Sequence, residues 1–246
     1  MPSQGWYGMI KQKNINNFGL ERFDWYLPAS VVTEFAVPKS LPHIYNCIGF
    51  DLRSEDLYPE QAEFLAVLDF AREGKEEERS IQIAALKATQ TKYICLNGKY
   101  TRKEIRSIYR RCNLYFTSTR ESFSLPVLEV QLCGGMIATP YAKWLPAHFV
   151  DKDIYSIGEG NLGSNFIVYD NCQSKLEKQI IHLKQAFNAQ RNVENFKTEY
   201  PSYFEINKDE LADFCLKVQN KQIHGELHKG YINLNKLLNK EINIFK

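Results

Sequence analysis

Residues 114–139 read LYFTSTRESFSLPVLEVQLCGGMIAT, and this stretch decides the fold. It opens with a short apolar run, Leu114–Ser118, of the kind that forms a strand buried on both faces of a sheet. Pro126 suits the first turn of a helix, and Gly134–Gly135 suits its end. A second apolar run, Met136–Thr139, predicts the next strand. Strand, helix and strand joined by short connections predict a βαβ unit with parallel strands.

The same alternation continues on both sides of this unit. Further strands are predicted at Phe64–Leu68, Tyr93–Leu96 and Phe166–Tyr169, and further helices at about Glu76–Ala88, after the capping-box pair Thr101 and Glu104, and at about Ser174–Gln190. The sequence therefore predicts an α/β fold: a doubly wound, mostly parallel Rossmann-like sheet with helices on both faces. In such folds ligands bind at the carboxyl ends of the strands.

Composition narrows the class of protein. The chain has 246 residues, 44% hydrophobic and 24% charged, which is typical of a globular protein with a full core. A formal net charge of +2 gives no reason to expect nucleic acid as a partner. The six cysteines lie in apolar segments without metal-site spacing, which predicts buried thiols in a reducing compartment.

The periodic region divides the chain into three parts. We expect an N-terminal extension or remnant of a linker or first domain at 1–60, a Rossmann-like domain at 61–195 and a helical extension at 196–246. No segment has the pattern of a signal peptide or a membrane span. The sequence therefore predicts a cytoplasmic protein, and lysine clusters in the tail leave peripheral attachment to a membrane open.

The loop between the third strand and its helix contains the most informative chemistry. Glu121 lies in this loop, and Glu129 lies about one turn into the helix, with its side chain directed back toward the helix start. Free N–H groups at a helix N-terminus bind phosphate oxygens, and carboxylates accept hydrogen bonds from sugar hydroxyls. In the alternative interpretation, Glu121 is a solvated loop residue and Glu129 complements the helix dipole.

The run from Tyr100 to Pro140 resembles the donor-binding half of the GT-B retaining glycosyltransferases, whose mark is Glu, seven residues, Glu. It departs from that family at Ser122 and Ser124, where Gly is usual, and at Gly135-Met136. The family features that it keeps are Glu121, Phe123, Leu125, Pro126, Glu129, Gly134 and the strand Ile137–Thr139.

The resemblance implies roles for individual residues. It implies that Glu129 holds the ribose hydroxyls and that Glu121 contacts the transferred sugar. It also implies that Arg72 and Lys75 neutralise the leaving diphosphate, so that no metal and no cofactor is needed. The residues whose backbone N–H groups would meet sugar and diphosphate are Ser122, Phe123, Ser124 and Leu125. In the alternative interpretation, Arg72 and Lys75 belong to a solvated charged face with the neighbouring glutamates.

By this resemblance, we expect one half of a GT-B fold that transfers a sugar from a nucleotide diphosphate sugar to an acceptor, with retention. The acceptor class stays open among carbohydrate, lipid-linked and protein acceptors, as in polysaccharide biosynthesis. A separate N-terminal domain or subunit is the expected partner, because about 60 residues are too few for the first domain of such an enzyme. The alternative is a non-catalytic nucleotide-sugar-binding module, or a regulatory partner of a complete transferase.

Three other patterns are weaker. Residues 158–163 match G-x-G-x-x-G, but the predicted strand Phe166–Tyr169 follows them where a dinucleotide site requires a helix. His224 and His228 have the i, i+4 spacing of metal ligands, yet Gly225 weakens a helix there. His148 follows the fourth predicted strand and is interpreted as a structural hydrogen-bonding residue.

Overall fold

The computed structural model describes residues 55–119, 121, 124–140, 161–170, 172–201, 204 and 208–222. The chain divides into two compact units. One unit spans Gly49–Phe204 and contains every described strand, and the other combines Met1–Ile48 with Glu205–Lys246. Helix α9 (Lys208–Gln219) belongs to the second unit. The division of the chain at residues 60 and 195 stays a prediction.

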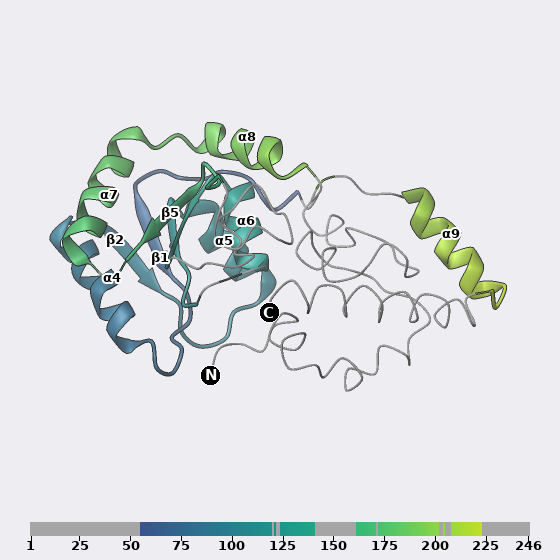
Figure 1. Cartoon of the computed structure of the whole chain (residues 1–246), viewed down its shortest axis with the longest axis horizontal. Coiled ribbons are helices and arrows are strands. Elements are labelled where there is room, and N and C mark those ends of the chain that lie inside the picture. Colours follow the sequence, from purple (N-terminus) through teal and green to yellow (C-terminus); the bar gives the residue numbers. More distant parts are fainter. Residues whose placement is uncertain are drawn as a thin grey trace, which may run out of the picture. The chain divides into compact units, whose positions relative to one another are not determined.

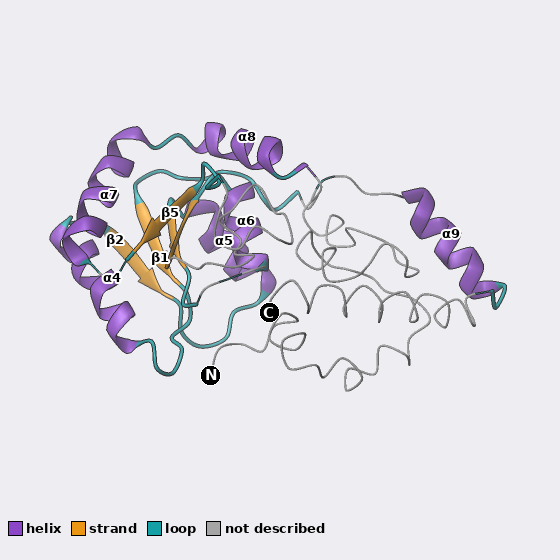
Figure 2. Ribbon diagram, in the orientation of Figure 1, coloured by secondary structure: helices purple, strands orange, loops and turns teal. Residues whose placement is uncertain are grey.

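The larger unit is built on a parallel sheet (Figures 1 and 2). Its strand order is β2-β1-β3-β4-β5, and all four neighbouring pairs are parallel. The strands are β1 (Leu65–Leu68), β2 (Lys92–Cys95), β3 (Leu114–Phe116), β4 (Met136–Pro140) and β5 (Phe166–Tyr169). The predicted α/β class and the predicted βαβ unit are confirmed.

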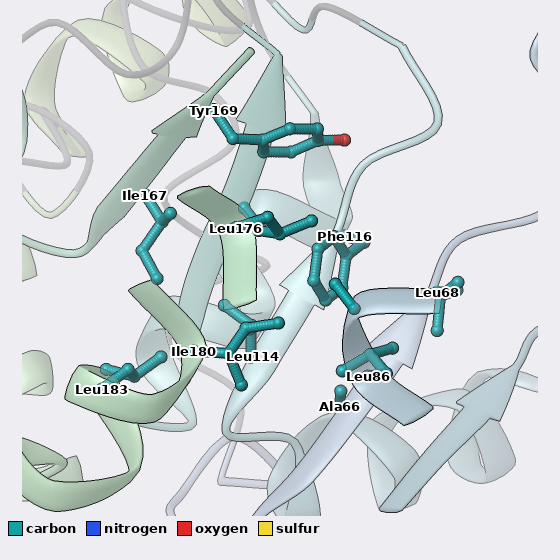
Figure 3. Close-up of a cluster of buried hydrophobic side chains, with 12 residues drawn as sticks. Ala66, Leu68, Leu86, Leu114, Phe116, Ile167, Tyr169, Leu176, Ile180 and Leu183 are labelled. Carbon is teal, nitrogen blue, oxygen red and sulfur yellow. The ribbon is translucent and has the colours of Figure 1, made fainter. Parts of the chain in front are cut away.

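Among the described residues of this unit, helices pack on both faces of the sheet, and two cores form because side chains alternate along each strand. Leu68 and Phe116 face a core with α4 and α7, which Figure 3 shows around Leu176 and Ile180. Val67, Tyr115 and Ile137 face the opposite core with α5 and α6. The helices are α4 (Glu76–Ala88), α5 (Arg102–Arg111), α6 (Leu125–Leu132), α7 (Gln173–Ala186) and α8 (Ala189–Glu199).

Helix boundaries follow local chemistry. The capping box of α5 is confirmed: Thr101 accepts from the backbone of Glu104, whose carboxylate accepts from the backbone of Thr101. The prediction of one helix over about Ser174–Gln190 was wrong, because α7 ends at Ala186 and α8 begins at Ala189. Asn188 explains the break, since its side chain accepts a 2.9 Å hydrogen bond from the backbone N–H of Arg191 and thereby caps a new helix.

The strand order creates a place for a ligand. From β1 the chain adds β2 on one side, and it adds β3, β4 and β5 on the other. The loops that leave the carboxyl ends of β1 and β3 therefore turn to opposite faces of the sheet and leave a crevice between them. Arg72 and Lys75 lie in the loop after β1, and Glu121 lies in the loop after β3.

Two predictions from composition can also be examined. Cys112 and Cys133 are buried in the core, as predicted, but the prediction was wrong for Cys95 and Cys172, which are partly buried, and for Cys215 on α9, which is exposed. None of the described helices combines the length and the apolarity that crossing a membrane requires.

Candidate functional site

The loop after β1 presents cations at the crevice. Its turn is closed by a 3.2 Å hydrogen bond from the backbone N–H of Lys75 to the carbonyl of Arg72, with Gly74 at a φ of 75°. Arg72 is exposed and Lys75 is half-buried. The Lys75 ammonium lies 2.9 Å from a carboxylate oxygen of Glu78, so this neighbour offsets part of its charge.

A small, shallow hollow lies beside this turn. Arg72, Lys75, Arg79 and Ser118 are among the residues that line it, and the role of Arg72 and Lys75 toward a diphosphate stays a prediction. Arg79 donates a 2.5 Å hydrogen bond to the backbone carbonyl of Asp69, which ties the start of α4 to the end of β1. Arg79 was not expected from the sequence, because the charged residues around it predict only a solvated helix face.

Glu121 lies in the loop after β3. It is half-buried, and its carboxylate accepts a 2.6 Å hydrogen bond from the Thr119 hydroxyl. Burial raises the pKa of Glu121 above its ordinary value, and the neighbouring Asp69 raises it further, whereas the Thr119 hydrogen bond and the charge of Arg72 lower it. The charge of Arg72, in the loop after β1, therefore acts on Glu121, in the loop after β3, although Glu121 is not among the residues that line the hollow.

Beneath the loops, a row of buried polar side chains crosses the sheet edge. The Tyr115 hydroxyl donates a 2.7 Å hydrogen bond to Asp69, and the Tyr109 ring meets the Tyr115 ring edge-on at 5.7 Å. Burial raises the pKa of both tyrosines, so both hydroxyls stay protonated at neutral pH. The charge of Glu129 contributes to the raised pKa of Tyr109.

Glu129 already has a protein partner. Its Oε1 accepts hydrogen bonds from Nε of Arg106 at 2.9 Å and from Nη2 of Arg106 at 2.6 Å. Arg106 is 2% exposed and Glu129 is 8% exposed. The sequence analysis missed Arg106, because a charged residue on α5 is expected to face water. The ribose-binding role of Glu129 stays a prediction.

The start of α6 completes the crevice. Ser124 is its N-cap residue with an extended φ of −155°, and the Ser124 side chain makes no capping hydrogen bond. Pro126 lies in the first turn, as predicted, and Leu125 is 39% exposed. The predicted contacts of Ser122 and Phe123 lie outside the described residues.

Of the three weaker sequence patterns, only the glycine-rich segment lies partly within the described residues. Strand β5 begins at Phe166, three residues after Gly163, where the sequence predicted a strand, and residues 158–160 lie outside the described residues. Residues 148, 224 and 228 lie outside the described residues. Within the part of the chain that the structure describes, no cluster of three or more His, Cys, Asp or Glu side chains has the arrangement of a metal site.

We compared the chain with known proteins. No protein-family profile matches it, and no curated protein matches it. Among solved structures, it is similar to the C-terminal domain of a glycosyl transferase group 1 family protein from Francisella tularensis, with 15% sequence identity and a TM-score of 0.41. The similar region covers 58% of this chain and 95% of that chain. The class of this protein follows from its own sheet: a Rossmann-like α/β unit with charged groups at the carboxyl edge.

Proposed function

We propose that the chain contains the donor-binding domain of a metal-independent, retaining glycosyltransferase that uses a nucleotide diphosphate sugar. The proposal is supported by the strand order, which sends the loops after β1 and β3 to opposite faces of the sheet, and by the charge of Arg72, which acts on the pKa of Glu121 across these loops. The Glu-x7-Glu resemblance of residues 100–140 supports it independently, because that pattern belongs to enzymes with this ligand.

The diphosphate would lie between the two loops. Arg72 and Lys75 would approach it from the β1 side, and the first N–H groups of α6 would approach it from the β3 side. The N-terminal end of α6 is suited to an anion, since its dipole is positive there and the Ser124 side chain leaves the N–H groups uncapped. Stabilisation of the negative charge on the departing diphosphate is the main task of such a site.

The two glutamates would bind the two ends of the donor. Glu121, beside Arg72, would accept hydrogen bonds from hydroxyls of the transferred sugar. Glu129, one turn into α6, would accept hydrogen bonds from the ribose. The acceptor, whether carbohydrate, lipid-linked or protein, would enter from the sugar side and would be bound by a separate domain or subunit.

Calorimetric titration with UDP, GDP and ADP tests the diphosphate site. Arg72→Gln should weaken binding of the tightest of these by about ten- to a hundredfold, the effect of losing a hydrogen bond from a charged group. Lys92→Gln is the matched control, because Lys92 is also a surface cation but begins β2 at the opposite edge of the sheet. Equal losses for the two variants, or no binding by the wild-type chain, would refute the proposed site.

A donor-hydrolysis and transfer assay separates the enzyme from the alternative. Turnover of the sugar donor, alone or with an added partner domain, supports a glycosyltransferase. Tight binding with no turnover under either condition supports a non-catalytic nucleotide-sugar-binding module or a regulatory partner.

A further inference from the structure

The Arg106–Glu129 pair has an unusual division of hydrogen bonds. A guanidinium facing a carboxylate commonly forms two parallel bonds, one to each oxygen. Here both N–H groups reach the same oxygen, Oε1, at 2.9 and 2.6 Å. Among the described residues, no hydrogen bond reaches the other oxygen, Oε2.

Arg106 cannot itself serve as a surface contact. Its side chain is 2% exposed, whereas the Glu129 side chain is 10% exposed. Removing two charges from water costs free energy that can exceed the gain from their attraction. A buried ion pair therefore contributes little to the free energy of folding. The pair is better suited to hold the Glu129 carboxylate in one rotamer. The planar guanidinium of Arg106 loses little conformational entropy for each hydrogen bond that it forms.

The position of Glu129 fits this use. It lies four residues after Leu125, the first residue of α6, and side chains on a helix lean toward the N-terminal end. The Glu129 side chain therefore leans toward the end of α6 that would hold the diphosphate. In a nucleotide the ribose is the group next to the diphosphate, so its hydroxyls would lie one turn from the phosphate-binding N–H groups.

We infer that Arg106 is the positioning residue that holds Oε1 of Glu129, so that Oε2 is left to accept hydrogen bonds from the ribose hydroxyls of a nucleoside diphosphate. This inference rests on the proposed function and adds to it the residue that sets discrimination between ribose and deoxyribose.

The test measures that discrimination by calorimetry. UDP, GDP and ADP are titrated, and the tightest is compared with its 2′-deoxy and 3′-deoxy analogues and with inorganic pyrophosphate. In the wild-type chain, loss of a hydroxyl that Glu129 binds should weaken affinity by about ten- to a hundredfold. Arg106→Lys keeps the charge but cannot direct two fixed N–H groups at one oxygen, so this ratio should fall to about threefold or less.

Pyrophosphate provides the readout that a purely structural role would not separate. Its affinity should stay within about twofold in Arg106→Lys, because Arg72, Lys75 and α6 bind it without the ribose. Arg110→Lys is the matched control: Arg110 is one turn further along α5 and pairs with Glu60 at 2.9 Å, and its replacement should leave the ribose ratio unchanged.

Each outcome decides between the two proposals. An unchanged ribose ratio in folded Arg106→Lys, or an equal loss of pyrophosphate binding, overturns the positioning role and leaves the diphosphate site standing. If the wild-type chain binds nucleoside diphosphates but does not discriminate against deoxyribose, the positioning role is likewise overturned and the diphosphate site stands. A wild-type chain that binds none of the three nucleotides overturns both.

A crystal structure of the wild-type chain with the tightest nucleotide keeps the test independent of the variant's stability. We expect a ribose hydroxyl about 2.5–3.0 Å from Oε2 while Arg106 stays on Oε1. A ribose bound elsewhere, or an Arg106 side chain that has left Glu129, would overturn the inference.

Discussion

At the residue scale, the surroundings of Glu121 have opposing effects on the pKa of its carboxyl group. Burial and Asp69 raise its pKa, and the Thr119 hydroxyl and Arg72 lower it, with burial the largest effect. A raised pKa means that ionised Glu121 destabilises the folded chain at neutral pH. A donor that brings hydroxyl groups to this carboxylate would replace the water that it has lost.

Glu121→Gln should therefore raise the free energy of unfolding at pH 7, because it removes a charge that is costly in the folded state. As pH falls, the wild-type residue takes up its proton first in the folded state, so the difference between the proteins should shrink. It should vanish below the ordinary value of 4.5. Urea denaturation between pH 4 and 8 measures this difference, and a difference that grows toward low pH would contradict the assignment.

Thr117, directly after β3, is 2% exposed. Its hydroxyl oxygen has no hydrogen-bond partner among the described residues. Thr117→Val keeps the shape and removes the unsatisfied group, so it should raise the free energy of unfolding by about 1 kcal/mol. Thr91→Val is the matched control, because Thr91 is also buried, at 5% exposed, and its hydroxyl lies 2.8 Å from that of Thr89. The control should lower stability, and equal effects in urea denaturation would contradict the explanation.

At the element scale, the packing of α8 against α6 depends on a close approach at Gly134. This residue has a φ of 79°, and a Cβ atom there would lie 2.7 Å from Cβ of Ala189 and 2.8 Å from its carbonyl oxygen. Neither atom is the end of a flexible side chain. Gly134 therefore serves both the backbone turn after α6 and the contact with α8.

The two contributions can be separated with a second glycine. Gly98 has a φ of 76°, but a Cβ atom there would meet nothing within 4 Å. Gly98→Ala should lower the free energy of unfolding by about 1 kcal/mol, the cost of the left-handed conformation. Gly134→Ala should cost about 1–3 kcal/mol more, because it also overpacks the helix contact. If denaturant unfolding gives equal losses of free energy for the two variants, α8 moves away from the added methyl group without loss of stability, which would contradict the explanation.

The elements that the sequence predicts well are those with strong local patterns. Helix α4 has the predicted bounds, Glu76–Ala88, and the capping box of α5 lies at the predicted residues. The break between α7 and α8 was missed because Phe187 continues the apolar period of α7, and the apolar pattern therefore hides the Asn188 cap.

The site was harder to predict because its contacts are not local. Arg106 looks like a surface residue of α5, and its partner Glu129 is 23 residues away on another helix. The spacing of apolar residues along a helix predicts which side of the helix a residue lies on. It does not predict which residue of another helix that side chain contacts. Arg72 and Lys75 were singled out by the family resemblance, and topology adds only that a loop after β1 lies at the carboxyl edge of the sheet. The additional residues of the hollow, Arg79 and Ser118, required the three-dimensional packing of α4 on the sheet.

At the scale of the larger unit, the two edges of the sheet differ in chemistry. At the amino edge, amide side chains bind one another and the backbone: Asn165 donates to the carbonyl of Asn192 at 2.7 Å, and Asn192 donates to the carbonyl of Gly134 at 2.9 Å. At the carboxyl edge, Arg72 is exposed and Glu121 is half-buried. The amino edge is therefore suited to stability, and the carboxyl edge to binding.

Hydrogen exchange should report this difference across the unit. A nucleoside diphosphate at 100 times its dissociation constant stabilises the folded state by about 2.7 kcal/mol, which slows every amide that exchanges through global unfolding. Amides that exchange through local opening gain protection only where the ligand sits. We expect such local gains at residues 69–75 and 124–128, and none at residue 164 or residues 192–195. Pyrophosphate should reproduce the gains at 69–75, because the cations of the β1 loop bind the diphosphate. Local gains at the amino edge, measured by mass spectrometry with and without UDP, GDP and ADP, would place the ligand elsewhere and contradict the crevice between β1 and β3 as the binding site.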